Sequence, residues 1–358
     1  MLRLGPRRAT QRPRKEVNGL PDMPTPQQVH VDRYLTNMAI MYSQEADIWI
    51  ASKVFPIVPV LKKSDLYVKF PKGYFMRDEM EPRPLGGRPK ATGYELDQGT
   101  YSCEEEALEH KIDDRVRENA DEPIAPDLRG MELLTEKALI HRDREWAANY
   151  FTSSAWDVTW KGVKKESEAK PEEDKFLQFN VWKAGGEESK PIEFFDALAT
   201  QMRRTTGRRP NKLVLGADLY VALKNHAEVI ERIKYTQSPP AVITPGILAA
   251  LFDVGEVLIA ESISNSAKEG QEDNIGFIVD SKSALLLYAA PSPSIYTPSA
   301  GYTFAWTGLI PGVTNSFGGV IQRGREELAH TDVIQIRCAY DMQATAQDLG
   351  VFIEGAIA

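Results

Sequence analysis

The chain has 358 residues, of which 42% are hydrophobic and 26% are charged, and its formal net charge is −8 at pH 7. These proportions indicate a globular protein, and the length favours two lobes because single cores rarely grow beyond about 250–300 residues. They exclude a membrane-spanning helix, since no apolar run reaches the roughly 18 residues that a bilayer requires. The first residues are charged and no apolar stretch follows, so we expect no export signal and a cytosolic product.

A short basic segment opens the chain. Its six basic residues all precede the first acidic residue, Glu16, and are Arg3, Arg7, Arg8, Arg12, Arg14 and Lys15. Such a segment can neutralise phosphates with an affinity that depends on salt and not on base sequence. A solvated, disordered terminus explains the same pattern equally well.

The next stretch reads as an extended arm. Residues 31–52 show weak helical periodicity, and residues 51–59 place apolar side chains beside Pro56 and Pro59. Because proline cannot donate to a sheet ladder, the second pattern favours an edge strand. We expect the apolar residues of this arm to be covered by a neighbour.

Residues 60–112 predict a long two-stranded loop. Leu66, Val68 and Phe70 alternate with polar neighbours and indicate one strand, whereas the return over 99–112 fits either a strand or the start of a helix. The middle is rich in proline and glycine and cannot form a buried layer. A two-stranded ribbon is marginally stable alone, so we expect contacts with another copy of the chain. The basic residues expected at these contacts are Arg77, Arg83, Arg88 and Lys90.

Residues 126–151 predict one long amphipathic helix. Pro126 suits the first helical position, where its missing N–H costs little. Apolar residues recur at helical spacing and form two adjacent stripes: Met131, Leu134, Ala138, Leu139, Trp146 and Tyr150. Polar residues occupy the rest of the wheel, namely Glu132, Glu136, Lys137, Arg142, Asp143 and Arg144. The helix joins the extended arm to a compact body.

The body alternates strands and helices without a strict βαβ repeat, which favours the α+β class. We expect strands near 156–163, 176–182, 212–215, 255–260, 275–279, 284–288, 302–306 and 331–340, with a surface loop over 164–175. Helices are expected over 191–206, over 218–234 as one or two pieces, and from Pro245 to about Phe252 with Thr244 as N-cap.

The chain carries no recognisable catalytic or metal-binding motif. Its five histidines are scattered, and Cys103 and Cys338 lie far apart, so we read them as surface or capping groups and ordinary thiols. The acidic residues in 104–106 and 113–114 could bind a divalent ion, but their contiguity favours a solvated face. We therefore predict no enzyme activity, no cofactor and no metal.

Five segments of the second half carry a resemblance to a known family: Leu213–Tyr235, Thr244–Phe252, Pro298–Trp306, Ala339–Gln343 and Asp348–Gly350. They are similar to segments of the major capsid proteins of tailed bacteriophages, which have the Hong Kong 97-type fold. The first half resembles that family by its layout of arm, extended loop and spine helix. Some members join subunits through a Lys–Asn bond, but no asparagine follows Asn315, so we do not predict this crosslink.

The resemblance implies a division of the chain into five parts. These are an N-terminal arm (1–59), an extended loop (60–112), a peripheral domain with the spine helix (113–190), an axial domain (191–326), and a returning peripheral strand with the C-terminus (327–358).

The resemblance also implies a structural, non-enzymatic function. The chain would self-assemble through pentamers and hexamers into an icosahedral virion shell around double-stranded DNA, with assembly in the host cytoplasm. Implied partners are a separate scaffolding protein, a portal, DNA bound without sequence preference and, optionally, a decoration protein, but no membrane.

Two alternatives stay open. An encapsulin-like compartment would keep the fold and store a cargo enzyme, but the basic segment favours the virus, because a cargo shell has no DNA to neutralise. An enzyme or soluble binding module would need active residues that the motif search did not find.

Overall fold

A computed structural model of the protein describes residues 30–31, 48–69, 71–83, 85–118, 126–163, 177–180, 189–234, 243–268, 271–294, 297–309 and 319–357. The six basic residues near the N-terminus lie outside these ranges, as do most of the weakly helical stretch 31–52 and the expected loop 164–175. Among the described residues, no helix combines the length and the apolar character needed to cross a bilayer.

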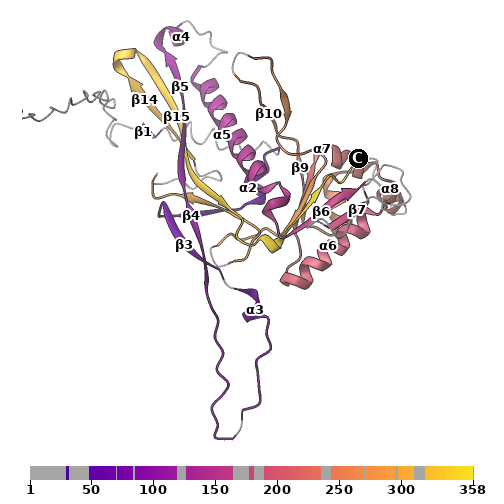
Figure 1. Ribbon diagram of the computed structural model, residues 1–358. Coiled ribbons are helices and arrows are strands. Elements are labelled where there is room, and N and C mark those ends of the chain that lie inside the picture. Colours follow the sequence, from indigo (N-terminus) through magenta and orange to yellow (C-terminus); the bar gives the residue numbers. More distant parts are fainter. Residues whose placement is uncertain are drawn as a thin grey trace, which may run out of the picture.

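Two six-stranded sheets form the body, and a ribbon leads away from it (Figure 1). We call the first the long sheet; its order is β1-β14-β15-β13-β2, and β5 pairs with β15 as well. Its strands are β1 (His30–Val31), β2 (Ile57–Val60), β5 (Glu104–Asp113), β13 (Tyr302–Trp306), β14 (Gly319–Glu326) and β15 (Thr331–Gln343). The predicted late strand is therefore confirmed as β15, and β14, which pairs with it along eight residues, was not predicted.

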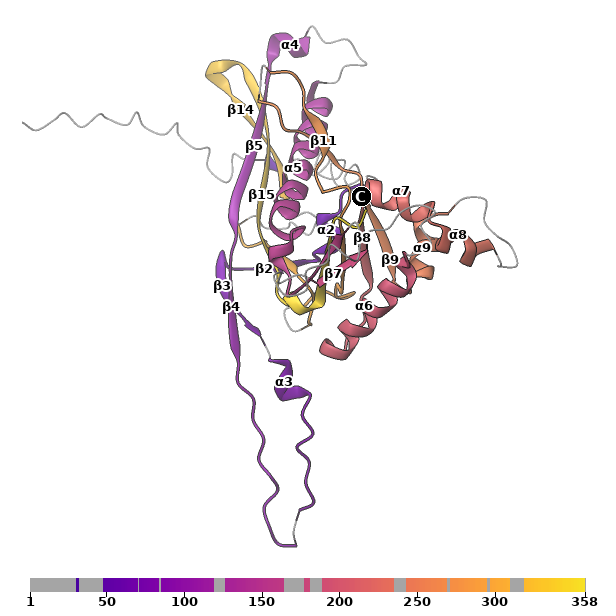
Figure 2. The same ribbon diagram turned by 45° about the vertical axis from the view of Figure 1, so that its right-hand side comes forward.

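The predicted long helix is confirmed as α5 (Pro126–Tyr150), and it lies along β5 and β15 in both ribbon views (Figure 1, Figure 2). Its apolar stripe forms one core with alternate residues of β15. The buried members from the helix include Met131, Leu134 and Trp146, and those from the strand include Ile334, Ile336 and Tyr340. Alternation along β15 thus places one face under the helix, as the strand period of two requires.

The sequence prediction was wrong for two side chains of this helix. Arg142 and Asp143, expected on the polar side, are both buried. Asp143 is used structurally, because its carboxylate accepts the backbone N–H groups of Ile50 and Ala51 at 3.2 and 3.0 Å. Burial lowers the pKa of Arg142 and raises that of Asp143, and the attraction between the two charges opposes both shifts.

The region predicted as an edge strand over 51–59 divides in two. Its second half is confirmed as β2, which pairs in parallel with β13 at the end of the long sheet. Its first half is a short helix, α2 (Ala51–Val54). The bonds from Asp143 hold the start of this turn, and Phe55 packs edge-on against Trp146, so tertiary contacts override the strand pattern here.

The second, compact sheet has the order β7-β6-β16-β12-β8-β9. Its strands are β6 (Val158–Val163), β7 (Leu177–Asn180), β8 (Lys212–Gly216), β9 (Glu256–Ala260), β12 (Ala284–Leu287) and β16 (Gly350–Glu354). Five of them match expected strands, and β16 was missed. The sheet therefore combines strands from both sides of the expected boundary at residue 190.

Four helices pack against this compact sheet, and apolar residues from all four share one core with it. They are α6 (Pro191–Thr206), α7 (Ala217–Lys224), α8 (Ala227–Lys234) and α9 (Pro245–Leu251). The predicted stripe on α6 is confirmed, since Ile192, Phe195, Leu198 and Met202 are all buried. Thr244 occupies the N-cap position of α9 as expected, but its side chain makes no capping hydrogen bond.

Smaller elements complete the fold. Among the described residues they are the ribbon strands β3 (Ser64–Lys69) and β4 (Asp97–Ser102), the hairpin β10 (Ile263–Asn265) and β11 (Ile275–Phe277), the helices α3 (Lys72–Phe75) and α4 (Asp114–Glu118), and the 3-10 turns Ser153–Ala155, Glu327–Ala329 and Gln347–Leu349. The ambiguous return over 99–112 therefore splits into β4, which pairs with β3, and β5, which joins the long sheet.

Candidate functional site

The most unusual feature is the loop that leaves the body between β2 and β5. We call residues 61–102 the projecting loop; it extends away from the end of the molecule that carries α4 (Figure 1, Figure 2). Met80 and Leu85 near its tip are 94% and 108% exposed. The other strongly exposed apolar side chains of the loop are Leu61, Leu66, Val68, Phe75, Met76, Tyr94 and Leu96. Exposed apolar surface on this scale typically marks an interaction site.

The base of the loop is anchored in the body. Tyr67 of β3 and Tyr101 of β4 stack on Phe304, with ring centroids 5.4 and 4.7 Å apart. The Cys103 thiol, just after β4, donates to the Phe304 carbonyl oxygen at 3.4 Å. The indole N–H of Trp306 donates to the Leu61 carbonyl oxygen at 3.0 Å. Together these contacts fix the direction in which the loop leaves the body.

Beyond β3 and β4, Lys72 at the start of α3 pairs with Asp348 of the body at 2.5 Å, and farther out the loop is held by contacts between its own two arms. Phe75 and Tyr94 pack with centroids 5.6 Å apart, and Lys90 pairs with Glu81 at 2.5 Å. Exposed ion pairs contribute only about 0–1 kcal/mol each. The outer half of the loop therefore receives little stabilisation from its own subunit.

The structure places the four predicted loop contacts, Arg77, Arg83, Arg88 and Lys90, on this outer half, and all four are exposed. Two of them are partly used inside the loop: Lys90 binds Glu81, and the Arg83 guanidinium donates to the Gly87 carbonyl oxygen at 2.8 Å. Contact with a second subunit stays a prediction for all four.

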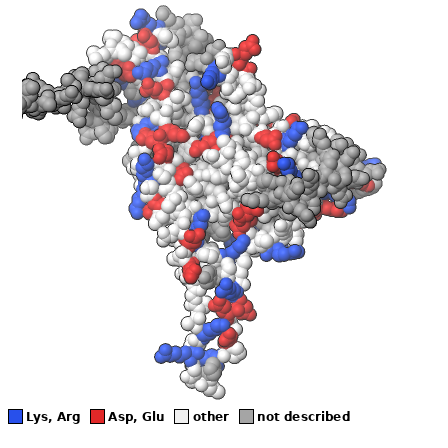
Figure 3. Space-filling view, in the orientation of Figure 1, with Lys and Arg blue, Asp and Glu red and all other residues white. Residues whose placement is uncertain are grey.

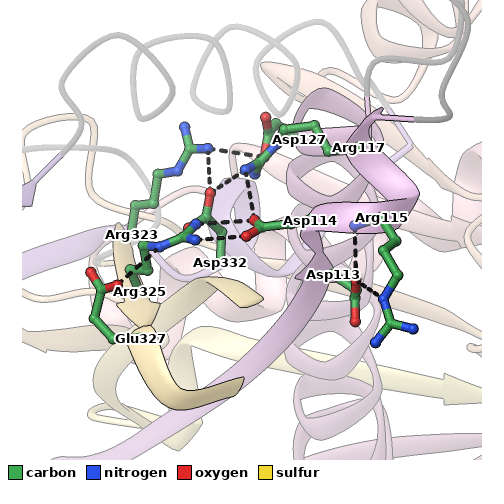
Figure 4. Close-up of polar contacts among 9 residues, drawn as sticks. All are labelled: Asp113, Asp114, Arg115, Arg117, Asp127, Arg323, Arg325, Glu327 and Asp332. Carbon is green, nitrogen blue, oxygen red and sulfur yellow. Dashed lines mark hydrogen bonds and ion pairs between the residues drawn. The ribbon is translucent and has the colours of Figure 1, made fainter. Parts of the chain in front are cut away.

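A cluster of ion pairs lies at the end of the molecule that carries α4 (Figure 1) and was missed in the sequence; its contacts are drawn in Figure 4. We call it the ion cluster; it consists of Asp114, Arg117, Asp127, Arg323, Arg325 and Asp332. Arg325 bridges Asp114 at 2.7 Å and Asp332 at 3.0 Å, which joins α4 to β14 and β15. Its members come from segments about 200 residues apart, so no local pattern could have revealed it.

The arginines of the ion cluster lower the pKa values of two of its aspartates, Asp114 and Asp332. The hydrogen bond from Arg325 lowers the pKa of Asp114. Burial alone would raise the pKa of Asp332, but hydrogen bonds from Arg117, Arg325 and Arg323 outweigh it and lower that pKa. The sequence suggested that Asp114 belongs to a solvated acidic face, but in the structure this residue is paired with Arg325. Glu105 is also paired, with Arg337 at 2.5 Å. The pairing of β5 with β15 brings these carboxylates close to the arginines.

Ser189 and His226 form a buried hydrogen-bonded pair that does not have the geometry of a catalytic serine and its base. His226 is buried, and its Nε2 lies 2.5 Å from the Ser189 hydroxyl oxygen. The backbone N–H of Glu228 donates to Nδ1 at 3.2 Å, so the proton sits on Nε2 and points at the serine. In a catalytic pair the serine hydroxyl donates its proton to the histidine, so the hydrogen bond here runs in the opposite direction.

The two cysteines are both free and buried, as ordinary thiols. Burial raises the pKa of Cys103 and of Cys338 to about 12. At neutral pH neither sulfur is present as the reactive thiolate.

Comparison with known proteins agrees with the architecture. The chain is 29% identical over 275 residues to the major capsid protein of Burkholderia phage BcepMu, and the match covers 76% of this chain and 82% of that protein. The chain is a homologue of phage major capsid proteins. No family model matches it.

Solved structures place this capsid protein homologue in the Hong Kong 97-type fold and confirm the α+β class. A phage-related protein from Bordetella bronchiseptica superposes with a TM-score of 0.66 at 22% identity, covering 92% of this chain and 98% of the other. The capsid of cyanophage P-SCSP1u gives a TM-score of 0.50 at 10% identity, covering 85% and 87%. At these identities the matches establish the fold alone.

The capsid homologue presents a mixed charge distribution on the face shown in Figure 3, with acidic and basic side chains interspersed over the body and along the projecting loop. Interspersed charge favours specific ion pairs with a partner over a general attraction to one sign of charge.

Proposed function

We propose that this chain is the structural subunit of an icosahedral shell that encloses double-stranded DNA. The observation that carries the proposal is the exposure of apolar side chains on the projecting loop, of which Met80 and Leu85 near the tip lie outside any core. Burying one large apolar side chain contributes about 1.5–3 kcal/mol. Several such residues on one loop supply enough free energy to drive association once a neighbouring copy covers them.

The proposal assigns roles along the chain. Residues 1–59 are the arm, 60–112 the extended loop, and 113–190 with 327–358 the peripheral part, around an axial domain over 191–326. In this division β5 serves both the loop, which it follows, and the long sheet, which it joins. The rigid base at Phe304 supports the proposal, because a loop aimed in a fixed direction can reach the same site on every neighbour.

The DNA-facing role is assigned to the basic segment near the N-terminus, in which Arg3, Arg7, Arg8, Arg12, Arg14 and Lys15 occur without an acidic residue. Such a segment binds phosphates without regard to base sequence. An acidic scaffolding protein would meet the same residues before DNA enters. A portal and an optional decoration protein complete the proposed set of partners, and assembly takes place in the host cytoplasm.

Shell formation is tested with the full-length protein by sedimentation velocity and negative-stain electron microscopy. We expect shells or capsomers. The double variant Met80→Ser, Leu85→Ser should sediment as smaller species and keep the far-UV circular dichroism of the parent, because both side chains lie outside any core. Ala91→Ser on the same loop is the control and should assemble normally. A parent chain that stays monomeric at high concentration contradicts the proposal.

The nature of the contents is tested separately. Particles recovered from phage-producing cells are treated with nuclease, and the protected nucleic acid is measured. We expect double-stranded DNA. Particles that hold only protein would indicate a cargo compartment built on the same fold.

A further inference from the structure

Three side chains of metal-binding type meet where β5 passes α5. Glu106 lies on β5, and His141 and Glu145 lie four residues apart on α5, which places them on one face of the helix. The ligand atoms of the three residues all lie within 4.8 Å of one another, and His141 Nε2 is 3.1 Å from Glu106 Oε1. In the sequence this histidine looked isolated, because 35 residues separate it from Glu106.

A fourth side chain orients the two carboxylates. The Tyr340 hydroxyl of β15 lies 3.1 Å from Glu106 Oε2 and 3.0 Å from Glu145 Oε2. A hydroxyl has one proton and can donate it to only one of two carboxylates at a time. The arrangement therefore holds two carboxylates close together and leaves the other oxygen of Glu106, Oε1, facing His141.

Glu106 and His141 are accessible to solvent, with 42% and 59% of their side chains exposed. A cavity of about 450 Å³ lies beside it and is lined by Glu106, His141 and Tyr340 together with Leu108 and Ile336. Lys137 also lines this cavity, but within the described part of the chain it forms no ion pair with either carboxylate. An ion in this cavity can therefore approach Glu106 and His141 without displacing a basic side chain.

We propose that Glu106, His141 and Glu145 bind one divalent transition-metal ion, of which Zn²⁺ is the best fit, with Tyr340 as the positioning residue. An imidazole nitrogen with two carboxylate oxygens suits Zn²⁺ and its neighbours in the transition series, whereas Mg²⁺ and Ca²⁺ prefer oxygen ligands throughout. Bonds of about 2.0–2.2 Å to three protein atoms leave a fourth position for water. The ion would fasten β5, and with it the strand that follows the projecting loop, to α5.

The test uses metal-free full-length protein in whatever assembly state it adopts, since binding is counted per chain. Isothermal titration with Zn²⁺ should give one site per chain, and metal analysis after gel filtration should find one equivalent. Co²⁺, used as a spectroscopic substitute, should give the visible absorption of a four-coordinate ion. A failure of shell formation would leave this result unchanged, so the two proposals are tested independently.

Variants decide whether the bound ion occupies this site. His141 is exposed, so His141→Ala should fold normally and weaken Zn²⁺ binding by at least about 100-fold, while Tyr340→Phe should weaken it by about tenfold. His330→Asn is the matched histidine control; it lies in a left-handed turn that asparagine tolerates, and its Zn²⁺ binding should equal that of the parent. Absence of a stoichiometric site, unchanged binding in His141→Ala, or an equal loss in His330→Asn would overturn the proposal.

Discussion

The Asp143 carboxylate of α5 accepts the backbone N–H of Ala51 at 3.0 Å, across 92 residues of sequence. It also accepts the N–H of Ile50 at 3.2 Å. Both N–H groups lie on residues that are 1% exposed, so water cannot replace the carboxylate. One side chain of the long helix thus positions the short helix that leads through β2 into the projecting loop.

We predict that Asp143→Ala lowers the free energy of unfolding by about 2 kcal/mol or more. Each buried N–H left without an acceptor costs about 1–3 kcal/mol, and removal of a buried carboxylate, whose pKa burial raises, returns part of that cost. Guanidinium unfolding followed by circular dichroism measures the change. Arg144→Ala, exposed on the same turn, should stay within about 0.5 kcal/mol of the parent. Equal effects of the two variants would show that the carboxylate has no anchoring role.

The ion cluster predicts a loss of stability in acid. Asp114 and Asp332 have lowered pKa values in the folded chain, so their contribution is present above the ordinary value of 3.8 and is lost as the pH falls below it. Arg325→Ala should lower the melting temperature at pH 7 and have a smaller effect near pH 3, where protonation of the unfolded chain already reduces what these ion pairs contribute to stability. Thermal unfolding at both pH values measures the difference.

A matched arginine separates this effect from a general loss of surface charge. Arg115 is 90% exposed, and within the part of the chain that the structure describes its guanidinium pairs only with Asp113, at 3.4 Å. Arg115→Ala should therefore change the melting temperature little at either pH. A difference between parent and Arg325→Ala that stays constant from pH 7 to pH 3 would mean that the cluster does not contribute through its carboxylates.

The end of β8 predicts a steric requirement for glycine. A Cβ on Gly216 would lie 2.3 Å from the Ser281 carbonyl oxygen and 2.6 Å from that of Asp280. This backbone cannot move aside freely, because the N–H of Gly216 bonds to Ser283 and that of Leu219 to Ser281, both at 3.0 Å. Gly216→Ala should cost about 2 kcal/mol, within the usual range for overpacking.

Gly324 on β14 is the control for this substitution. An added Cβ there meets nothing within 4 Å, so Gly324→Ala should be neutral or slightly stabilising. Guanidinium unfolding of both variants measures the contrast. Similar midpoints for the two would show that the close approach at the end of β8 relaxes at little cost.

Periodicity predicted the elements whose burial follows a regular stripe. The helices α5 and α6 and the strand β15 all have this property, and the structure confirms them. The misses share another property: β16 lies between β12 and β6, and the burial of Asp143 depends on Ile50 and Ala51. Their surroundings are supplied by residues far away in the chain, which no local window contains.

The features of the candidate site also divide into those that a local pattern predicts and those that it does not. Charged residues among prolines and glycines predicted that the segment around Arg88 would project, because such a composition cannot form a buried layer. The ion cluster and the group around His141 could not be predicted, since each joins side chains from separate elements. A histidine and a glutamate four residues apart on a predicted helix was the one local signal for the second group.

The projecting loop predicts a charge-dependent step in assembly. Arg88 is exposed near the tip, and within the described residues it forms no ion pair, whereas Lys90 is already paired with Glu81. Arg88→Glu should slow assembly by about tenfold at low salt, because a reversed charge opposes the approach of the neighbouring surface. Light scattering after mixing of dissociated subunits measures the rate.

The salt dependence and a conservative variant complete this test. At about 1 M salt the Debye length falls to roughly 3 Å, so the rates of the parent and of Arg88→Glu should converge. Arg88→Lys keeps the charge and should assemble at close to the parent rate, with the same melting temperature for all three proteins. If Arg88→Lys is as slow as Arg88→Glu, the loop contact depends on the shape of the guanidinium group and not on its charge.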